Sequence, residues 1–149
     1  MEPTIVTWAL ILFGLITHGI LTYIYIVFAR DPHSKQAKDR MIGQGKDWRD
    51  KTHFRLNVGF AWTDFMLFVP LLVFGCIGML LGQTWGYLLF GAAGACSLYA
   101  NITLWFVEKE HVYPALGPLR YYTYFWGFFV YWGALALAYS ALRVSGFEF

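Results

Sequence analysis

Two polar residues lie deep inside segments of this chain that are otherwise apolar. Asp64 falls within residues 56–81, and Asn101 falls within residues 85–107. A carboxylate near the middle of a membrane-crossing segment is costly unless it is paired, protonated or in contact with a cavity, so such residues usually mark functional sites. An asparagine costs less and is also typical of a hydrogen bond between helices. Asp64 is therefore the first candidate for chemistry.

His18 is the third polar side chain at a similar depth. If the segments are helices, Asp64 lies about 13 Å, Asn101 about 10 Å and His18 about 18 Å from the charged boundary of its own segment. We therefore expect the three side chains to converge. A protonated Asp64 would donate a proton or a hydrogen bond, whereas an Asp64 that lies against His18 would form an aspartate–histidinium pair. As a structural alternative, Asp64 and Asn101 would hydrogen-bond each other or a backbone carbonyl.

The elements that must position these residues are four apolar segments. The chain has 149 residues, of which 58% are hydrophobic and 13% are charged. A helix needs roughly 20 apolar residues to cross a hydrocarbon core, and stretches of that length occur at 4–29, 56–81, 85–107 and 121–142. We predict an all-α integral membrane protein, with residues 1–149 folded as one bundle of four transmembrane helices.

Basic residues are concentrated in the polar loop of residues 30–55. This loop holds eight of the eleven Lys and Arg residues, and Lys109 and Arg120 in the loop 108–120 bring the total to ten. With four crossings the two loops share a side of the membrane, and the excess of positive charge predicts that this side is cytoplasmic. Both termini are then non-cytoplasmic, in a cell inner membrane or in the endoplasmic reticulum.

Small residues should control how the second and third segments pack. Pro70 is expected to kink the second segment. Small residues at spacings of three and four let helix backbones approach closely, and here they are Gly75, Gly78, Gly82, Gly86, Gly91, Gly94 and Ala95. We expect tight packing near these residues and a wider separation in the other halves of the two segments. That separation would leave a cavity open toward the basic loop.

Aromatic residues are denser in the fourth segment than anchoring at a membrane interface requires. Tyr131 and Trp132 lie about 16 Å inward of the tyrosines at the start of this segment, and Trp62 lies two residues before Asp64. Aromatic side chains at such a depth either fill the core of a bundle or form the wall of a ligand cavity. Tyr131, Trp132 and Trp62 are therefore candidates for ligand binding.

Two acid–histidine pairs lie at the boundary of the apolar segments. Asp50 with His53, and Glu108 with His111, have the i, i+3 spacing of di-metal sites in helix bundles. Such sites also need further inward carboxylates, and here lysines interleave both pairs. We interpret the pairs as a solvated rim, keep Glu108 as a candidate ligand contact, and predict no metal and no cofactor. The basic loop lacks interleaved stacking aromatics, so we expect no nucleic acid as a partner.

Several short motifs are distributed over most of the chain. They are residues 14–18 (Gly-Leu-Ile-Thr-His), Asp64 six residues before Pro70, residues 98–101 (Leu-Tyr-Ala-Asn), residues 105–108 (Trp-Phe-Val-Glu), residues 117–119 (Gly-Pro-Leu) and the aromatic run that reaches Trp132. Together these motifs resemble the EXPERA-type membrane domain, the four-helix unit of emopamil-binding sterol isomerases and of the sigma-two receptor.

This resemblance implies a cavity inside the bundle that binds sterol-like or cationic amphiphilic molecules. In the isomerases a protonated acidic group transfers a proton to a sterol double bond, and polar and aromatic groups stabilise the carbocation. By this resemblance His18 and Asp64 are the acid–base candidates. Trp132 would be a wall that stabilises the cation, and Tyr99 and Asn101 would be supporting groups.

The expected function is to bind a hydrophobic sterol- or isoprenoid-like lipid inside the bundle. If the protein is an enzyme, we expect an isomerase-type proton transfer that uses Asp64. The alternative is a non-catalytic accessory subunit of a larger membrane complex, in which the aromatic residues face a partner. A homodimer is compatible with either interpretation.

Overall fold

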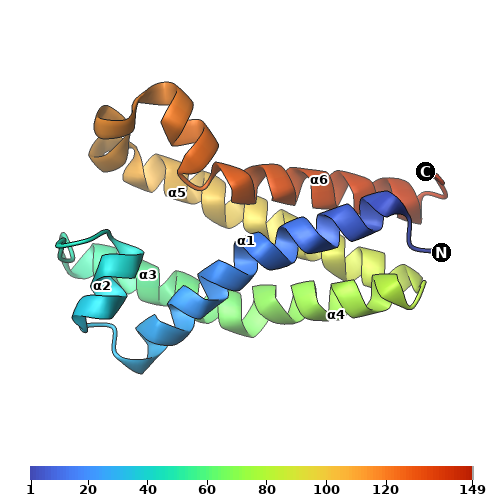
Figure 1. The fold of residues 1–149 in the computed structure, drawn as a ribbon, viewed down its shortest axis with the longest axis horizontal. Helices are drawn as coiled ribbons and strands as arrows, with labels where there is room; N and C mark the ends of the chain where they lie inside the picture. Colours follow the sequence, from blue (N-terminus) through green and yellow to red (C-terminus); the bar gives the residue numbers. More distant parts are fainter. Residues whose placement is uncertain (149) are drawn as a thin grey trace.

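Helices and loops make up the structure, a computed structural model that describes residues 1–148, and these residues contain no strand. In chain order the helices are α1 (Ile5–Arg30), α2 (Lys35–Met41), α3 (Lys51–Thr63), the π-helical turn η1 (Asp64–Phe68), α4 (Val69–Leu80), α5 (Thr84–Tyr124) and α6 (Gly127–Val144) (Figure 1). Because α3, η1 and α4 follow one another without a break, they form one long helix. The predicted all-α fold is confirmed.

Three helical stretches are long and apolar enough to cross a membrane. They are Ile5–Arg30, Lys51–Leu80 and Thr84–Val144. The third stretch contains both α5 and α6, which fold back on each other and lie side by side (Figure 1). In length and composition the helices therefore fit a helical membrane bundle.

The reversal between α5 and α6 differs from the predicted start of the fourth segment. α5 bends at Gly117, where φ is 72°. The chain then turns at Trp126, where φ is 61°, and α6 begins at Gly127 instead of near residue 121. Gly127 is required here because a Cβ atom at this position would overlap the carbonyl group of Tyr122. Since the residues around the turn are aromatic, hydropathy alone does not reveal it.

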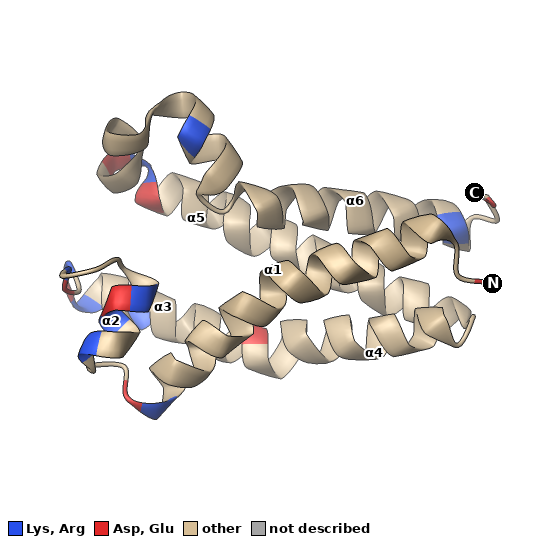
Figure 2. Ribbon diagram, viewed as in Figure 1, with Lys and Arg blue, Asp and Glu red and all other residues tan. Residues whose placement is uncertain are grey.

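Charge distinguishes the two ends of the bundle. Both chain termini lie at one end, which we call the terminal end, and α2, the start of α3 and the last part of α5 lie at the other (Figure 1). Nearly all Lys and Arg residues gather at this second end, which we call the basic end (Figure 2). Residues 30–55 and 108–120 thus lie at the same end of the bundle, as predicted. They are not simply loops, however, because the first range contains α2 and the start of α3, and the second belongs to α5.

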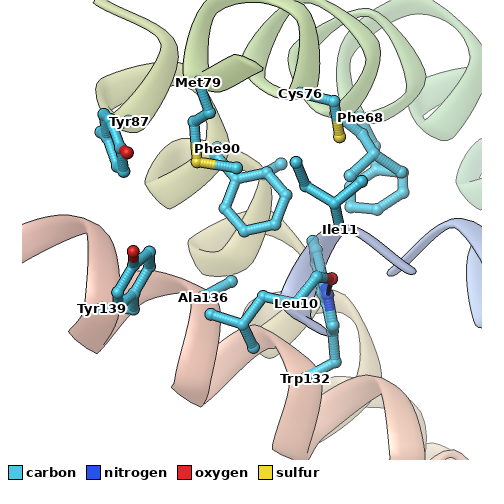
Figure 3. Close-up of a cluster of buried hydrophobic side chains, with 12 residues drawn as sticks. Leu10, Ile11, Phe68, Cys76, Met79, Tyr87, Phe90, Trp132, Ala136 and Tyr139 are labelled. Atoms are coloured by element: carbon cyan, nitrogen blue, oxygen red, sulfur yellow. Dashed lines mark hydrogen bonds between the residues drawn. The ribbon is translucent and has the colours of Figure 1, made fainter. Parts of the chain in front are cut away.

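Glycines allow close packing of helices toward the terminal end. A Cβ atom on Gly78 in α4 would collide with Gly86 in α5, and one on Gly94 in α5 would collide with the carbonyl oxygen of Gly133 in α6. Small residues at such positions let helix backbones meet. Between these helices and α1 lies a core of fully buried side chains, among them Met79, Phe90, Trp132 and Ala136 (Figure 3).

Side chains rather than backbones hold the basic end together. α4 packs closely against α5, whereas α3 diverges from α5 (Figure 1). A second hydrophobic cluster joins α1, α2 and α3 here, with Ala37 of α2 fully buried in it. Phe28 of α1 lies 5.8 Å from the ring of Trp48 and 6.4 Å from the ring of Phe54. The separation expected for the second and third apolar segments is therefore present.

The π-helical turn η1 lies at the point where the long helix changes from loose to tight packing. The N–H group of Val69 bonds to the carbonyl oxygen of Asp64, five residues earlier instead of four. Pro70 explains this location because it has no N–H group for the carbonyl of Met66, and its ring would clash with that carbonyl in a regular α-helix. A widened turn relieves the conflict. The predicted kink is thus a π turn whose first residue is Asp64.

Candidate functional site

A small polar cavity lies between α1, the junction of α3 with η1, and α5. Its polar lining consists of His18, Tyr25, Asp64, Ser97 and Asn101, and its apolar walls include Phe60, Phe68 and Ala100. The cavity volume is ≈ 10 Å³, which is room for about one water molecule. The structure therefore brings together His18, Asp64 and Asn101, the three polar residues expected to converge. We call this space the inner cavity.

Tyr25 is the hydrogen-bond partner of Asp64. The Tyr25 side chain is buried on α1, and it forms a side-chain hydrogen bond with the carboxyl group of Asp64. The ion pairs among residues 1–148 do not include one between Asp64 and His18. The aspartate–histidinium alternative therefore does not describe this structure, and Asp64 has a neutral partner instead.

His18 has hydrogen-bond partners at both ring nitrogens. Its Nδ1 lies 3.1 Å from the carbonyl oxygen of Gly14, and because a carbonyl only accepts, this nitrogen must carry a proton. Its Nε2 lies 3.3 Å from Oγ of Ser97. The Ser97 hydroxyl either donates to a neutral His18 or donates to the carbonyl oxygen of Phe129, 3.0 Å away, and accepts from a protonated His18. The network thus accommodates both protonation states of His18.

Asn101 extends this network along α5. Its side-chain nitrogen donates to the carbonyl oxygen of Ser97 at 2.7 Å and lies 3.3 Å from the Ser97 hydroxyl. Both bonds stay within α5, so the alternative in which Asn101 and Asp64 join two helices by bonding each other is not what the structure shows. The amide oxygen of Asn101 takes part in neither bond, which leaves an acceptor for a group in the inner cavity.

Aromatic rings enclose His18. The centroid of the His18 ring lies 4.6 Å from that of Phe68, and 4.4 Å from that of Trp132. Trp132 is fully buried, and its indole N–H group donates to the carbonyl oxygen of Leu10 at 3.0 Å. Trp132 therefore fills the core of the bundle (Figure 3) and packs against the His18 ring, but it does not line the inner cavity.

A larger hollow, which we call the outer groove, opens on the surface of the bundle between α3, η1 and α5. Its volume is ≈ 450 Å³ and most of its lining residues are apolar, with Arg55 on α3 nearest to the basic end. Four residues line both the outer groove and the inner cavity, namely Phe60, Asp64, Phe68 and Ala100. Asp64 therefore lies on the partition between a polar cavity and an apolar groove.

Besides Trp132 and Glu108, three predicted ligand contacts lie outside the inner cavity. Tyr99 lines the outer groove and is 76% exposed. Trp62 and Tyr131 are about half exposed on the surface of the bundle, and Tyr131 donates its hydroxyl group to the carbonyl oxygen of Tyr122. Position along a segment indicates the depth of a residue but not the face on which it lies, which explains the difference.

Glu108 belongs to an ion cluster at the basic end. Arg49 donates to both of its carboxylate oxygens, at 2.9 and 2.7 Å, and Nε2 of His53 lies 3.6 Å from one of them. The cluster joins the start of α3 to α5, so Glu108 has a structural partner and does not line either hollow. Among residues 1–148 no group of three or more His, Cys, Asp or Glu residues could hold a metal ion.

Sequence reasoning missed Tyr25 and Ser97 as residues of the site. Tyr25 follows His18 by seven residues, and Ser97 precedes Asn101 by four. Both spacings place the two members of a pair on the same face of a helix. The signal was therefore available, but hydroxyl groups are common near the ends of apolar helices and carry little information until the partner helices are placed.

Known proteins add no family assignment to this geometry. Comparisons with protein-family models, with curated proteins and with solved structures find no match to this chain. The functional argument therefore depends on the chemistry of the site.

Proposed function

We propose that this chain is an integral membrane protein whose bundle binds a hydrophobic, lipid-like molecule. The four spanning segments would be α1, the long helix α3–η1–α4, the first part of α5, and α6. The apolar composition and the length of the helices support this arrangement. The excess of Lys and Arg at the basic end supports a cytoplasmic location for that end.

The position of Asp64 is the observation that carries the proposal. It is an ionisable residue at the middle of a membrane-length helix, and it lines both the inner cavity and the outer groove. Such residues are rare in spanning helices and mark sites for ligands, ions or protons. An apolar groove that ends at a polar cavity matches a molecule with an apolar body and one small polar or reactive group.

The size of the outer groove supports a ligand of small-molecule size, such as a sterol- or isoprenoid-like molecule. The outer groove of ≈ 450 Å³ is within the range of about 300–1,000 Å³ found for small-molecule sites. The inner cavity has room for one hydroxyl-sized group. A hydroxyl group there would donate a hydrogen bond to Asp64 or to the amide oxygen of Asn101. The body of the molecule would lie along the outer groove against Phe60 and Phe68.

Isomerase-type proton transfer is the chemistry that the resemblance to the EXPERA family adds to this proposal. The protonated carboxyl group of Asp64 would give its proton to one carbon of an alkene. The other alkene carbon would then carry the positive charge, and a proton lost from the carbon beyond it would return to the carboxylate, so that the double bond moves by one position and the atoms balance. The faces of Phe60 and Phe68 would stabilise the intermediate cation.

Lipid extraction and mass spectrometry of the gently purified protein test this proposal. The wild type should retain one enriched sterol- or isoprenoid-like species, and Asp64→Asn should lose it while it still folds. Asp31→Asn, which makes the same chemical change at an exposed position before α2, is the matched control and should retain the species.

Bulk phospholipid alone in all three proteins, with unchanged stability, would contradict the ligand site. The observation that then matters is the exposure of large aromatic side chains, such as Tyr99, Phe106 and Tyr124. These would favour the alternative, an accessory subunit that buries them against another membrane protein. Co-purification of a stoichiometric partner with the wild type would support that function.

A further inference from the structure

A separate cluster of polar side chains is buried between α5 and α6 at the terminal end. Tyr87 is fully buried, and Ser140 and Arg143 are 3% and 5% exposed. The Tyr87 hydroxyl, the Ser140 hydroxyl and Nε of Arg143 have no hydrogen-bond partner among residues 1–148. Buried polar atoms are nearly always satisfied by the protein, by water or by a bound group. Tyr87 and Ser140 line one groove, and Arg143 lies against the Tyr87 ring. The three unsatisfied donors thus belong to neighbouring side chains, which indicates a missing acceptor.

Arg143 supplies positive charge to this cluster. Its guanidinium group lies 5.4 Å from the centroid of the Tyr87 ring, and one of its terminal nitrogens donates to the backbone carbonyl oxygen of Glu2 at 2.7 Å. None of the ion pairs among residues 1–148 involves Arg143. A buried guanidinium favours a carboxylate or a phosphate as its partner, so the missing acceptor is an anion.

A groove between α5 and α6 connects the cluster to the surface of the bundle. Its volume is ≈ 370 Å³, and both Tyr87 and Ser140 line it. Small side chains form much of the remaining lining, including Gly91, Ala92 and Ala95. From Tyr87 to Ala95 it follows α5 for about 12 Å. Its shape therefore suits a hydrocarbon chain that lies along the helices, with an anionic group beside the cluster.

From this geometry we infer that the α5–α6 groove binds one anionic glycerophospholipid. The phosphate would accept hydrogen bonds from the hydroxyl groups of Tyr87 and Ser140, which line the groove, and one acyl chain would occupy the rest of the groove. Arg143 does not line the groove, but its buried positive charge against the Tyr87 ring would favour an anion there. This site is distinct from the outer groove, which lies between α5 and the long helix and shares no lining residue with the α5–α6 groove. The inference depends on the membrane location of the chain but not on the ligand of Asp64.

Native mass spectrometry of the full chain in detergent tests the inference. Phosphatidylglycerol and diacylglycerol with identical acyl chains, which differ by the phosphate-containing head group, are titrated separately. The wild type should bind one phosphatidylglycerol about tenfold more tightly than diacylglycerol, the preference expected when a phosphate accepts hydrogen bonds beside a buried charge. Tyr87→Phe combined with Ser140→Ala should weaken phosphatidylglycerol binding by about tenfold.

Charge variants separate the lipid site from a general effect of basic residues. Arg143→Gln should abolish the preference for phosphatidylglycerol, and Arg143→Lys should keep part of it. Arg120→Gln removes one positive charge at the basic end and should leave the preference unchanged. If a variant of Arg143 does not fold, Tyr87→Phe still tests the site, because it removes only one hydroxyl group.

Three outcomes would overturn the inference. Equal affinity of the wild type for the two lipids would exclude recognition of the anion. Unchanged phosphatidylglycerol binding in the Tyr87, Ser140 and Arg143 variants would show that the lipid binds elsewhere. Full displacement of the lipid by millimolar inorganic phosphate would assign the cluster to a free anion.

Discussion

The two ends of the bundle are built on different contacts. Toward the terminal end, glycines bring α4, α5 and α6 together at the level of the backbone, as between Gly78 and Gly86. Toward the basic end, α3 leaves α5 and is held by aromatic side chains and by the ion pair of Arg49 with Glu108. Where the backbones of α4 and α5 meet, little space is left between them, whereas the separation of α3 from α5 leaves hollows. The inner cavity and the outer groove lie where backbone contact between the long helix and α5 ends and contact through side chains begins.

Gly86→Leu should have the largest effect on stability because it disrupts the close packing of α4 against α5. A side chain at this position meets the backbone of Gly78 and Met79, which cannot move aside, so we expect a loss of about 3 kcal/mol or more in stability. Thermal unfolding in detergent, followed by size-exclusion chromatography, measures it. Gly19→Leu is the control, since a Cβ atom on Gly19 has no neighbour within 4 Å. Equal stability of the two variants would contradict the role of backbone contact.

Ala100→Phe should block the inner cavity and the outer groove without unfolding the protein. Ala100 lines both the inner cavity and the outer groove, so a phenyl ring there should reduce the retained lipid-like species by about tenfold or more. Ala95→Phe introduces the same ring on α5 but into the α5–α6 groove, and it should retain that species. The readout is the amount of extracted species per mole of protein. A similar loss in both variants would point to a general effect of bulk on α5.

Glu108→Gln should loosen the basic end by a smaller amount. It removes the charge that holds Arg49 at 2.7 Å, and a pair at a partly exposed position contributes about 1 kcal/mol. We expect a modest decrease in thermal stability, and high salt should produce the same decrease in the wild type. The distances between spin labels at positions 51 and 109 should also become more widely distributed. Glu110→Gln, at an exposed position nearby, should change neither quantity.

Asp50→Ala should give the smallest effect, confined to the start of α3. The carboxylate of Asp50 accepts the backbone N–H groups of Thr52 and His53, and the bond from His53 holds the pKa of Asp50 below its ordinary value. Because the folded-state pKa is lowered, the stabilisation is complete above the unfolded-state value of about 3.9 and disappears as the pH falls through the folded-state value. Asp50→Ala should therefore melt earlier than the wild type at neutral pH but not in strong acid.

Asp50→Asn provides the comparison for the pH profile. Asparagine keeps the cap of the helix but does not titrate. Its stability relative to Asp50→Ala should therefore not change with pH. If the difference between the wild type and Asp50→Ala were constant down to strong acid, the carboxylate would not be the source of the stabilisation.

Much of this arrangement could be predicted from the sequence, because it follows from composition and spacing. Hydropathy predicts the helices, and the glycines of the second and third segments predict which halves pack closely. The depth of Asp64 and Asn101 on antiparallel helices predicts that they lie at the same level, and the structure places both around the inner cavity.

Features that depend on the rotation of a helix could not be predicted in this way. Tyr25 becomes the partner of Asp64, while Trp62 turns outward, because the face that each residue occupies is set by packing against other helices. The turn at Trp126 depends on close contact of Gly127 with a carbonyl group, which leaves no mark in hydropathy. The ion pair of Glu108 with Arg49 joins residues far apart in the chain.

The π-helical turn has a consequence for the angular phase of the long helix. A π turn is equivalent to one residue added to an α-helix, and one residue corresponds to a rotation of about 100°. The helical wheels of α3 and α4 are therefore offset from each other at Asp64–Phe68. A single wheel drawn through Lys51–Leu80 would assign residues on one side of η1 to the wrong face, so the two halves need separate wheels.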